Sequence, residues 1–354
     1  MVDILERADD REYADFAVRN RGMFFSSPGF LELLVEHLGC EFRCFAVRER
    51  GAIVGVLPMM FSAPGRFGPA ANSLPFYGSN GGFMVDRTLP VAKRSAVCSE
   101  LHGALLEECR RRRCVSATVI TSPFDEADDG QMVYDVVRPD FVDERIGQVT
   151  FLPRGCDDVG GALMTSYHSK TRNLVRKAMK GGFEIRETTM DPEALAFLHR
   201  VHADNLARIG GISKPLSFFC AIPRHFSPGE YRIFTAFLGD EPVAALLLFY
   251  YNGTVEYFTP VIVHEYRERQ PLSALIYHAM QHAVVSGYER WNWGGTWKTQ
   301  DGVYHFKKRW NADDLSYRYY VKCFNREVVN ADRAELLRDY PGFFVLPFSE
   351  LHGG

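Results

Sequence analysis

Residues 231–250 read YRIFTAFLGDEPVAALLLFY, and this stretch decides the fold. Apolar and polar residues alternate on both sides of Gly239-Asp240, which is the pattern of a β-hairpin with a tight turn. Residues 42–61, FRCFAVRERGAIVGVLPMMF, repeat this pattern around Gly51. A hairpin that recurs after roughly half the chain predicts that one structural unit occurs twice.

The sequence around each hairpin follows the same order. A helical stretch precedes the hairpin, and a further strand region, a long amphipathic helix and a short apolar strand follow it. These segments are 27–39, 72–85, 94–113 and 114–120 in the first unit, and 191–209, 253–263, 271–287 and 289–295 in the second. The order predicts a duplicated α/β module, with a first domain over 1–150, a second over 151–330 and a C-terminal extension over 331–354.

The composition is that of an ordinary soluble globular protein, because the 354 residues are 46% hydrophobic and 24% charged, with a net charge of −3. This charge gives no overall attraction to DNA or to an anionic membrane. The N-terminal residues MVDILERADDREYADF lack the basic start and apolar core of a signal peptide, and no apolar run approaches the roughly 18 to 20 residues of a membrane span. We therefore expect a cytoplasmic protein with no membrane span and no DNA partner.

Cysteine and histidine spacing predicts no metal site. The eight cysteines lack the paired spacing of a zinc site, and we expect reduced, mostly buried thiols. His278 and His282 lie four residues apart on a predicted helix, but Ala279 stands where a zincin has glutamate.

Residues 291–311, WNWGGTWKTQDGVYHFKKRWN, look like a binding site, because packing alone would favour aliphatic side chains. Trp293 and Trp297 flank a Gly-Gly pair and are expected to wall a substrate cleft, with the basic run facing its anionic contents. Tyr257 and Phe218 either stack on a base or sugar or belong to the core.

A basic helix is predicted within residues 166–187, SYHSKTRNLVRKAMKGGFEIRE. It carries Lys170 and Arg172 among its cations. The helix is either a solvated basic surface or an anion-facing wall beside a cleft.

The order helix, hairpin, strand, helix, strand is that of the GNAT acyltransferase fold, and a tandem pair of such modules resembles the FemABX family. Three stretches carry the resemblance: SKTRNLVRKAMKGGFEI (169–185), HADNLARIGGISKPLSFF (202–219) and GVYHFKKRWN (302–311), which follows a strand ending in Gly-Gly. FemABX enzymes build the interpeptide bridge of peptidoglycan precursors with amino acids from aminoacyl-tRNA. The resemblance implies two tandem GNAT-like modules, each a mixed, mostly antiparallel sheet flanked by helices, with the active site in the second.

The resemblance also implies roles for single residues. Lys307, next to Phe306, matches a family lysine that contacts the acceptor and is important for activity. Its charge would stabilise the oxyanion of acyl transfer or hold a substrate phosphate. Arg172 and Lys214 stand at positions similar to family residues that grip a nucleotide diphosphate. Independently of the resemblance, the chemistry of its side chain makes His305 a candidate general base.

The acyl donor is judged from the turn that precedes each long helix. A GNAT enzyme places the pyrophosphate of acyl-CoA on a turn of the form Arg/Gln-x-x-Gly-x-Gly/Ala at a helix N-terminus. Residues 266–277, YRERQPLSALIY, have no glycine there, and neither do residues 85–97, VDRTLPVAKRSAV. This weakens the acyl-CoA interpretation, although Gln270 and Ser273 offer polar groups to a donor. We expect no tightly bound cofactor and a donor that is aminoacyl-tRNA or acyl-CoA.

Three functions remain open. The leading one is an N-acyltransferase that joins an aminoacyl or other acyl group to a small-molecule or nucleotide-linked amine, in cell-wall, polysaccharide or natural-product biosynthesis. The alternative is an acyl-CoA-dependent N-acetyltransferase that acts on an amino sugar or small metabolite. The third is a non-catalytic binding protein. It would be favoured if both the native protein and a Lys307→Ala variant bound ligand without turnover.

Overall fold

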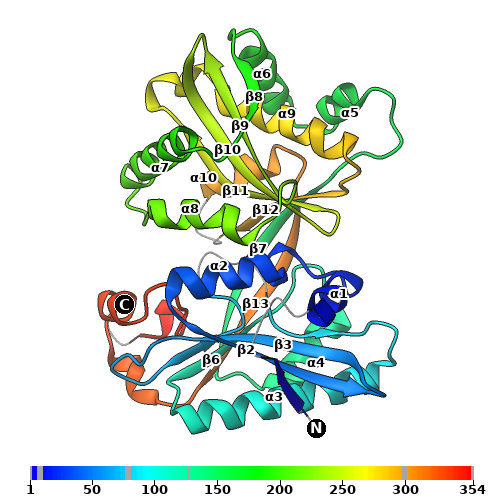
Figure 1. Ribbon diagram of the computed structural model, residues 1–354, viewed down its shortest axis with the longest axis vertical. Coiled ribbons are helices and arrows are strands. Elements are labelled where there is room, and N and C mark those ends of the chain that lie inside the picture. The colour runs from blue at the N-terminus through cyan, green and yellow to red at the C-terminus, as the bar shows by residue number, and fades with distance from the viewer. Residues whose placement is uncertain (1, 6–10, 76–80, 126, 297–300, 352–354) are drawn as a thin grey trace. The chain divides into compact units, whose positions relative to one another are not determined.

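The computed structural model describes residues 2–5, 11–75, 81–125, 127–296 and 301–351. The chain forms two compact units: unit 1 is Met1–Ile146 with Leu315–Gly354, and unit 2 is Gly147–Asp314. Strands β7 (Phe141–Phe151) and β13 (Asp313–Cys323) carry the chain from one unit to the other (Figure 1). Residues 315–354 therefore belong to unit 1, which differs from the predicted limits of 151–330 and 331–354.

Unit 1 contains a mixed sheet and five α-helices among its described residues. The helices are α1 (Arg11–Arg19), α2 (Pro28–Leu38), α3 (Val91–Arg112), α4 (Ala127–Val137) and α11 (Arg333–Asp339), with 3-10 turns at Phe24–Ser26, Arg326–Asn330 and Phe348–Glu350. The strands, besides those that cross between units, are β1 (Val2–Leu5), β2 (Glu41–Glu49), β3 (Ala52–Phe61), β4 (Ala70–Asn72), β5 (Met84–Val85) and β6 (Ser116–Ile120). They are ordered β1-β2-β3-β4-β6-β13, with β5 paired to β3. Strands β4 and β6 are parallel, and the other pairs in this order are antiparallel.

Local sequence explains these elements. The turn between β2 and β3 places Arg50 and Gly51 at positive φ, 51° and 87°, as a two-residue hairpin turn requires. Ser27 caps the N-terminus of α2 with its side chain. Leu101 and Leu105 of α3 are fully buried in the core cluster that this helix forms with the sheet.

The C-terminal residues complete the core of unit 1. Leu336 of α11 and Tyr340 belong to one buried cluster with Phe67 and Val115. The Tyr340 hydroxyl donates to the carbonyl oxygen of Gly68 at 2.9 Å and accepts from the Phe67 amide at 3.1 Å. Residues 331–351 are therefore an integral part of the unit rather than an appendage.

Unit 2 repeats the arrangement with additional helices. Its helices are α5 (Val159–Ser166), α6 (Ser169–Met179), α7 (Pro192–Ala207), α8 (Leu216–His225), α9 (Pro271–Val285) and α10 (Asp301–Lys308), with a 3-10 turn at His264–Arg269. Its strands are β8 (Glu184–Thr188), β9 (Tyr231–Leu238), β10 (Glu241–Tyr251), β11 (Thr254–Ile262) and β12 (Arg290–Thr296), in the order β12-β11-β10-β9-β8. Strands β11 and β12 are parallel, and the other three pairs are antiparallel.

The two units share one plan. A hairpin, β2-β3 or β9-β10, leads into a strand that pairs in parallel with the strand after the long helix. Three residue pairs join β4 to β6 across α3, and three join β11 to β12 across α9. The predicted duplicated α/β module with mixed, mostly antiparallel sheets is confirmed.

The described residues were also searched for membrane-spanning helices, metal-binding groups and paired cysteines. No helix in these parts of the chain is long and apolar enough to cross a membrane. Among the same residues, no group of three or more His, Cys, Asp and Glu side chains is placed to hold a metal ion. The rings of His278 and His282 pack against the Phe234 ring, with centroids 5.3 and 5.5 Å apart. All eight cysteines are free thiols, of which Cys220 is exposed.

Candidate active site in the second unit

The parallel strands of unit 2 stop pairing in the middle of the sheet. Their last register pair is Glu256 with Asn292, whereas β11 stays paired with β10 as far as Ile262. A β-bulge places Phe258 as an extra residue on β11, two positions after this last pair. Bulges are common next to active sites, and ligands of α/β sheets bind at the carboxyl ends of parallel strands. We therefore expect a ligand site at the residues that follow Glu256 and Asn292.

Aromatic rings pack beyond the last pair. The Tyr257 and Trp293 rings lie 4.9 Å apart between centroids, and the Phe306 ring meets Trp293 edge-on at 5.9 Å. Trp293 is only 3% exposed, so it is a core residue at this position rather than an open wall. Tyr257 and Phe306 are half-buried. The second predicted wall residue, Trp297, lies outside the described residues.

A buried carboxyl group lies at the last register pair. The Asn292 side-chain amide donates to Glu256 Oε2 at 2.7 Å, and Asn292 Oδ1 accepts from the Gly294 amide at 3.0 Å. Burial raises the pKa of Glu256 to about 8, although the Asn292 hydrogen bond and the charge of Lys307 act in the opposite direction. Sequence reasoning missed this residue; its signal was the single charged residue within the stretch 253–263.

Lys307 extends from α10 to the end of β12. Its ammonium group donates to the carbonyl oxygens of Gly294 and Gly295, at 3.3 and 3.1 Å, and to Thr296 Oγ1 at 2.8 Å. The residue is 6% exposed, and burial lowers its pKa to about 8, with Glu256 acting in the opposite direction. The sequence placed Lys307 next to aromatic residues; the short helix and these three acceptors were not predicted.

Buried polar side chains continue from the lysine. Thr296 donates its hydroxyl proton to Gln148 Oε1 at 2.9 Å, and Gln148 Nε2 donates to the Tyr304 carbonyl at 3.2 Å. Thr296 and Gln148 are at most 1% exposed. Because removing one member leaves another buried polar group unsatisfied, this network fixes α10 against β12.

A basic pocket of about 290 Å³ adjoins the same helix. Its lining consists of two histidines and three cations from α10 and from the start of α6: His168, Lys170, His305, Lys308 and Arg309. His168 Nδ1 accepts from the Lys170 amide at 3.2 Å, so its other ring nitrogen is the one that carries a proton. Lys308 lies 3.5 Å from the Asp314 carboxylate, which offsets part of the charge. The excess of cations suits a phosphate group.

Two separately predicted site residues, Lys170 and His305, thus line one pocket, whereas Arg172 is held elsewhere. Arg172 Nη1 donates to the Tyr167 carbonyl at 2.6 Å, which ties this guanidinium to the start of its own helix. The His305 ring is exposed and packs edge-on against Tyr304 at 5.2 Å.

Lys214 and Phe218 lie in another cluster, formed by the α7–α8 region and β11. The Lys214 ammonium sits 4.9 Å from the Phe258 ring centroid, and burial lowers its pKa to about 8. Phe218 is fully buried and stacks on Phe258 at 6.0 Å with an angle of 14°. Of the two interpretations given for Phe218, the core residue is the one that the burial supports.

The turn before α9 is closed on itself. The Gln270 amide donates to Arg267 O at 3.2 Å, and the Ser273 amide donates to Gln270 O at 2.9 Å. Pro271, at the first helical position, has no amide proton. Gln270 Nε2 donates to Arg267 O at 2.9 Å and the Ser273 hydroxyl to Gln270 Oε1 at 3.1 Å. The polar groups of Gln270 and Ser273, the two residues predicted to bind the acyl donor, are therefore used in hydrogen bonds to each other and to the backbone of the turn.

Residues 166–308 match the family model described as acetyltransferase (GNAT) domain. A sequence search of curated proteins found no match.

Among solved structures, FemX has a TM-score of 0.71 at 15% identity, covering 92% of this chain and 98% of FemX. The C-terminal domain of a putative lysylphosphatidylglycerol synthetase from Agrobacterium fabrum has a TM-score of 0.59 at 13% identity, covering 95% of this chain and 99% of that domain. A tandem GNAT protein from the clavulanic acid biosynthesis pathway has a TM-score of 0.54 at 9% identity, covering 91% of this chain and 98% of that protein. The chain thus has a fold similar to that of FemX and of a tandem GNAT protein, and residues 166–308 of its second unit match a GNAT domain model.

Proposed function

We propose that the protein is an N-acyltransferase of the FemABX/GNAT type, with its reacting groups in unit 2 near the end of the β11–β12 pairing. The observation that carries the proposal is the buried Lys307, whose ammonium group lies at the carbonyls of Gly294 and Gly295 just past that pairing. A buried cation acts strongly on a developing negative charge, because the low local dielectric does not screen it. The match to the GNAT domain model and the FemX-like fold support this reaction class.

The reaction would be amide formation. An amine nitrogen attacks the carbonyl carbon of an acyl ester, the carbon–nitrogen bond forms, and the carbon–oxygen bond to the donor breaks. The amine proton ends on the departing oxygen. In this proposal Lys307 stabilises the oxyanion, taking it in place of its longest contact, the 3.3 Å hydrogen bond to Gly294. His305 stays the candidate base, since it lines the basic pocket and its ring is exposed.

The turn before α9 supports an aminoacyl-tRNA donor over acyl-CoA. A pyrophosphate on this turn needs free amide protons. The amides of Gln270 and Ser273 already donate to carbonyls of the turn, and Pro271 has none to offer. The basic pocket, in contrast, offers Lys170, Lys308 and Arg309 to phosphates such as those near the 3′ end of a tRNA. The acceptor would be a small or nucleotide-linked amine of cell-wall, polysaccharide or natural-product synthesis, and the protein would work in the cytoplasm, where charged tRNA is available.

The proposal is tested by supplying radiolabelled aminoacyl-tRNA or acetyl-CoA with a panel of amines that includes a nucleotide-linked amino-sugar peptide. We expect an alkali-stable, labelled amide from aminoacyl-tRNA. A Lys307→Met variant should lower kcat by about 100-fold or more, as loss of an oxyanion donor does elsewhere. Lys177→Ala, which removes an exposed lysine of α6, is the control.

Thermal unfolding gives an independent answer about the donor. A ligand at 100 times its dissociation constant stabilises the protein by about 2.7 kcal/mol, which moves the unfolding midpoint measurably. Charged tRNA should shift the midpoint and acetyl-CoA should not. A shift with CoA alone would transfer the proposal to an acyl-CoA-dependent N-acetyltransferase, and ligand binding with no turnover by the native protein would leave a binding protein.

A further inference from the structure

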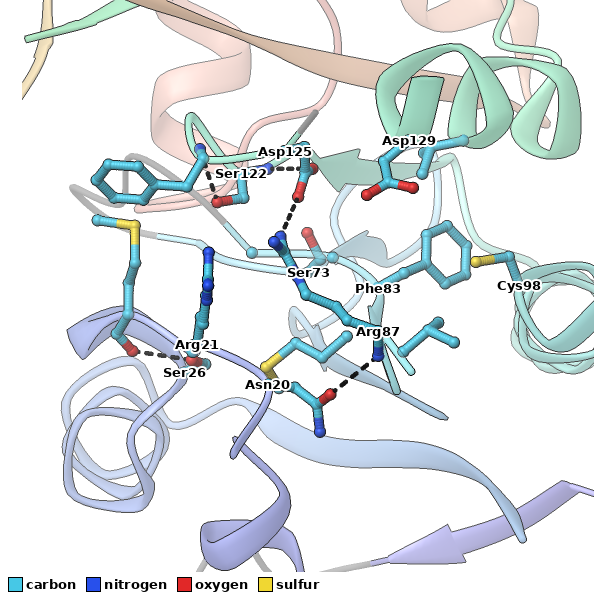
Figure 2. Close-up of a pocket in the computed structure, with 18 of the residues that line it drawn as sticks. Asn20, Arg21, Ser26, Ser73, Phe83, Arg87, Cys98, Ser122, Asp125 and Asp129 are labelled. Carbon is cyan, nitrogen blue, oxygen red and sulfur yellow. Dashed lines mark hydrogen bonds and ion pairs between the residues drawn. The ribbon is translucent and has the colours of Figure 1, made fainter. Parts of the chain in front are cut away.

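A pocket in unit 1 opens at the carboxyl end of that unit's own parallel strands. The register of β4 and β6 ends with Asn72 and Thr118. Ser73 follows directly: its amide donates to Thr118 O at 2.9 Å, and its hydroxyl accepts from the Ile120 amide at 2.9 Å. Beyond this point a cavity of about 70 Å³ includes Ser73 and Ser122 in its lining (Figure 2). Its position corresponds to the place where ligands bind in α/β sheets.

The two units differ at this position. In unit 2 the residue after the last pair is Tyr257, whose ring packs on Trp293 at 4.9 Å. In unit 1 it is the small Ser73, and Gly82 also lines the pocket. Gly82 has a φ of 86°, and a Cβ there would lie 2.6 Å from the Ile120 carbonyl oxygen, so this position requires glycine. Small residues thus leave unit 1 with the space that aromatic rings fill in unit 2, enough for several waters or a small ligand.

The pocket is lined by three arginines that are incompletely paired with its two carboxylates. Arg87 Nη2 stands 3.8 Å from Asp125 Oδ1, which is too long for a hydrogen bond. Arg94 forms an ion pair with Asp129, yet its Nε is buried and meets no acceptor among the described residues. The third, Arg21, is exposed and has no ion pair with any described residue. Three guanidinium groups against two carboxylates leave an excess of positive charge.

The side chains of Arg21 and Arg87 come from different segments and extend toward Ser122 and Asp125 (Figure 2). Asp125 Oδ2 accepts from the Ser122 amide at 3.0 Å. Burial raises the pKa of Asp125 to about 6, because Arg87 and the Ser122 amide compensate only part of the lost hydration. Asp125 is therefore a loosely held counter-ion, which a better-placed anion can displace.

Apolar side chains form much of the rest of the lining, which also includes Asn20 and Ser26. Phe25, Phe83, Phe124 and Met132 surround the charged groups. A lining that is mostly apolar with a few convergent polar groups is typical of small-molecule sites. The expected ligand therefore carries an anionic group on a small organic body.

We infer that this pocket is a ligand site of unit 1, and that it holds the carboxylate or phosphate group of a small organic ligand between Arg21 and Arg87. Arg94 Nε is a further donor, and Asp125 is the group that the ligand displaces from Arg87. The inference concerns unit 1 alone and does not depend on the proposed reaction in unit 2, so either can fail without the other.

The test is calorimetric titration of the full-length protein with phenyl phosphate, phenylacetate and the neutral benzyl alcohol. Arg21→Ala and Arg87→Ala should each weaken binding of the anions at least tenfold, as expected for a lost charge-assisted hydrogen bond. Asp125→Asn should tighten binding several-fold, because it removes the competing charge. Arg19→Ala, an exposed arginine of α1 outside the pocket, is the matched control.

Each result of the titration either supports or overturns the inference. Whichever anion binds more tightly identifies the ligand as a phosphate or a carboxylate. The inference is overturned if neither anion binds, if benzyl alcohol binds as tightly, or if the Arg21 and Arg87 variants bind like the native protein. Loss of binding in Asp125→Asn would also overturn it, since the Asp125 carboxyl group would then be required for anion binding rather than compete with the anion. Unfolding midpoints check that each variant folds. If Arg87→Ala does not fold, Arg21→Ala and Asp125→Asn are enough to test the inference, because the first should weaken anion binding and the second should tighten it.

Discussion

Asn292 and Glu256 face each other at the last register pair of two parallel strands, joined by a 2.7 Å hydrogen bond from the amide to the carboxyl group. With a pKa raised to about 8, Glu256 is mostly protonated at neutral pH. The pair therefore places a neutral, proton-bearing carboxyl group next to the strand end where Lys307 is bound.

The stability of the protein should depend on this proton. The pKa of Glu256 is higher in the folded than in the unfolded chain, so its contribution is fully present below about pH 4.5 and is lost as the pH rises to about 8. Glu256→Gln, which keeps the shape without the charge, should remove a slope of at most about 1.4 kcal/mol per pH unit from this range. Urea unfolding between pH 5 and 8 measures it. Parallel curves for the native protein and Glu256→Gln, with the exposed Glu268→Gln as control, would contradict the neutral carboxyl group.

Lys307 is predicted to matter for stability as well as for turnover. Lys307→Met keeps the volume but leaves the carbonyls of Gly294 and Gly295 without their donor. Because these groups are next to buried side chains, the free energy of unfolding should fall by about 1–3 kcal/mol. Urea unfolding measures the loss, with the exposed Lys180→Met as control. If Lys307→Arg recovers stability but not turnover, the reaction depends on the position of the charge rather than on packing. Turnover by Lys307→Met equal to that of the native protein would contradict an oxyanion role.

The basic pocket should govern the salt dependence of tRNA binding. Lys170→Ala with Lys308→Ala removes two of the cations that line it. Each phosphate contact on a single strand contributes about 0.7 to the slope of log affinity against log salt, so the slope should fall by roughly 1.4. Filter binding at several salt concentrations measures this. The double variant Lys177→Ala and Lys180→Ala changes two exposed lysines at the C-terminal end of α6 and should leave the slope unchanged. An equal effect of both pairs would mean that binding is not localised at the basic pocket.

The C-terminal segment should contribute to the stability of unit 1. Tyr340→Phe removes the hydroxyl that bonds Gly68 and Phe67. Two lost hydrogen bonds, one leaving a carbonyl and one an amide unpaired, should reduce the free energy of unfolding by about 1–3 kcal/mol. Denaturant unfolding followed by tyrosine and tryptophan signals measures it. An equal loss in Tyr134→Phe, where the side chain is 44% exposed, would show that the effect is not specific to this contact.

Much of the fold could be predicted because its signals are local. The hairpins, the long helices and the short strands after them all carry periodic apolar patterns, and the structure has an element at each. The long strands β7 and β13 were missed. Their pairing partners are distant in the sequence, so no local pattern predicts where β13 pairs with β6.

The site was predicted in part for the same reason. Lys307 and Phe306 could be identified because a short motif marks them. Glu256 and Gln148 could not, because their importance comes from burial beside residues far along the chain. Gln270 and Ser273 show the converse, since polar residues at a helix start were expected to meet a ligand and instead bond to each other.

The return of residues 315–354 to unit 1 has a consequence for synthesis on the ribosome. Domains generally fold as they emerge, the N-terminal one first. Here the first 146 residues emerge without β13 and without the Leu336 and Tyr340 side chains that complete their core, whereas unit 2 is continuous in the sequence. Unit 2 can therefore fold as soon as it leaves the ribosomal tunnel. Unit 1, whose first residues are synthesised before unit 2, completes its core only after unit 2 has been made.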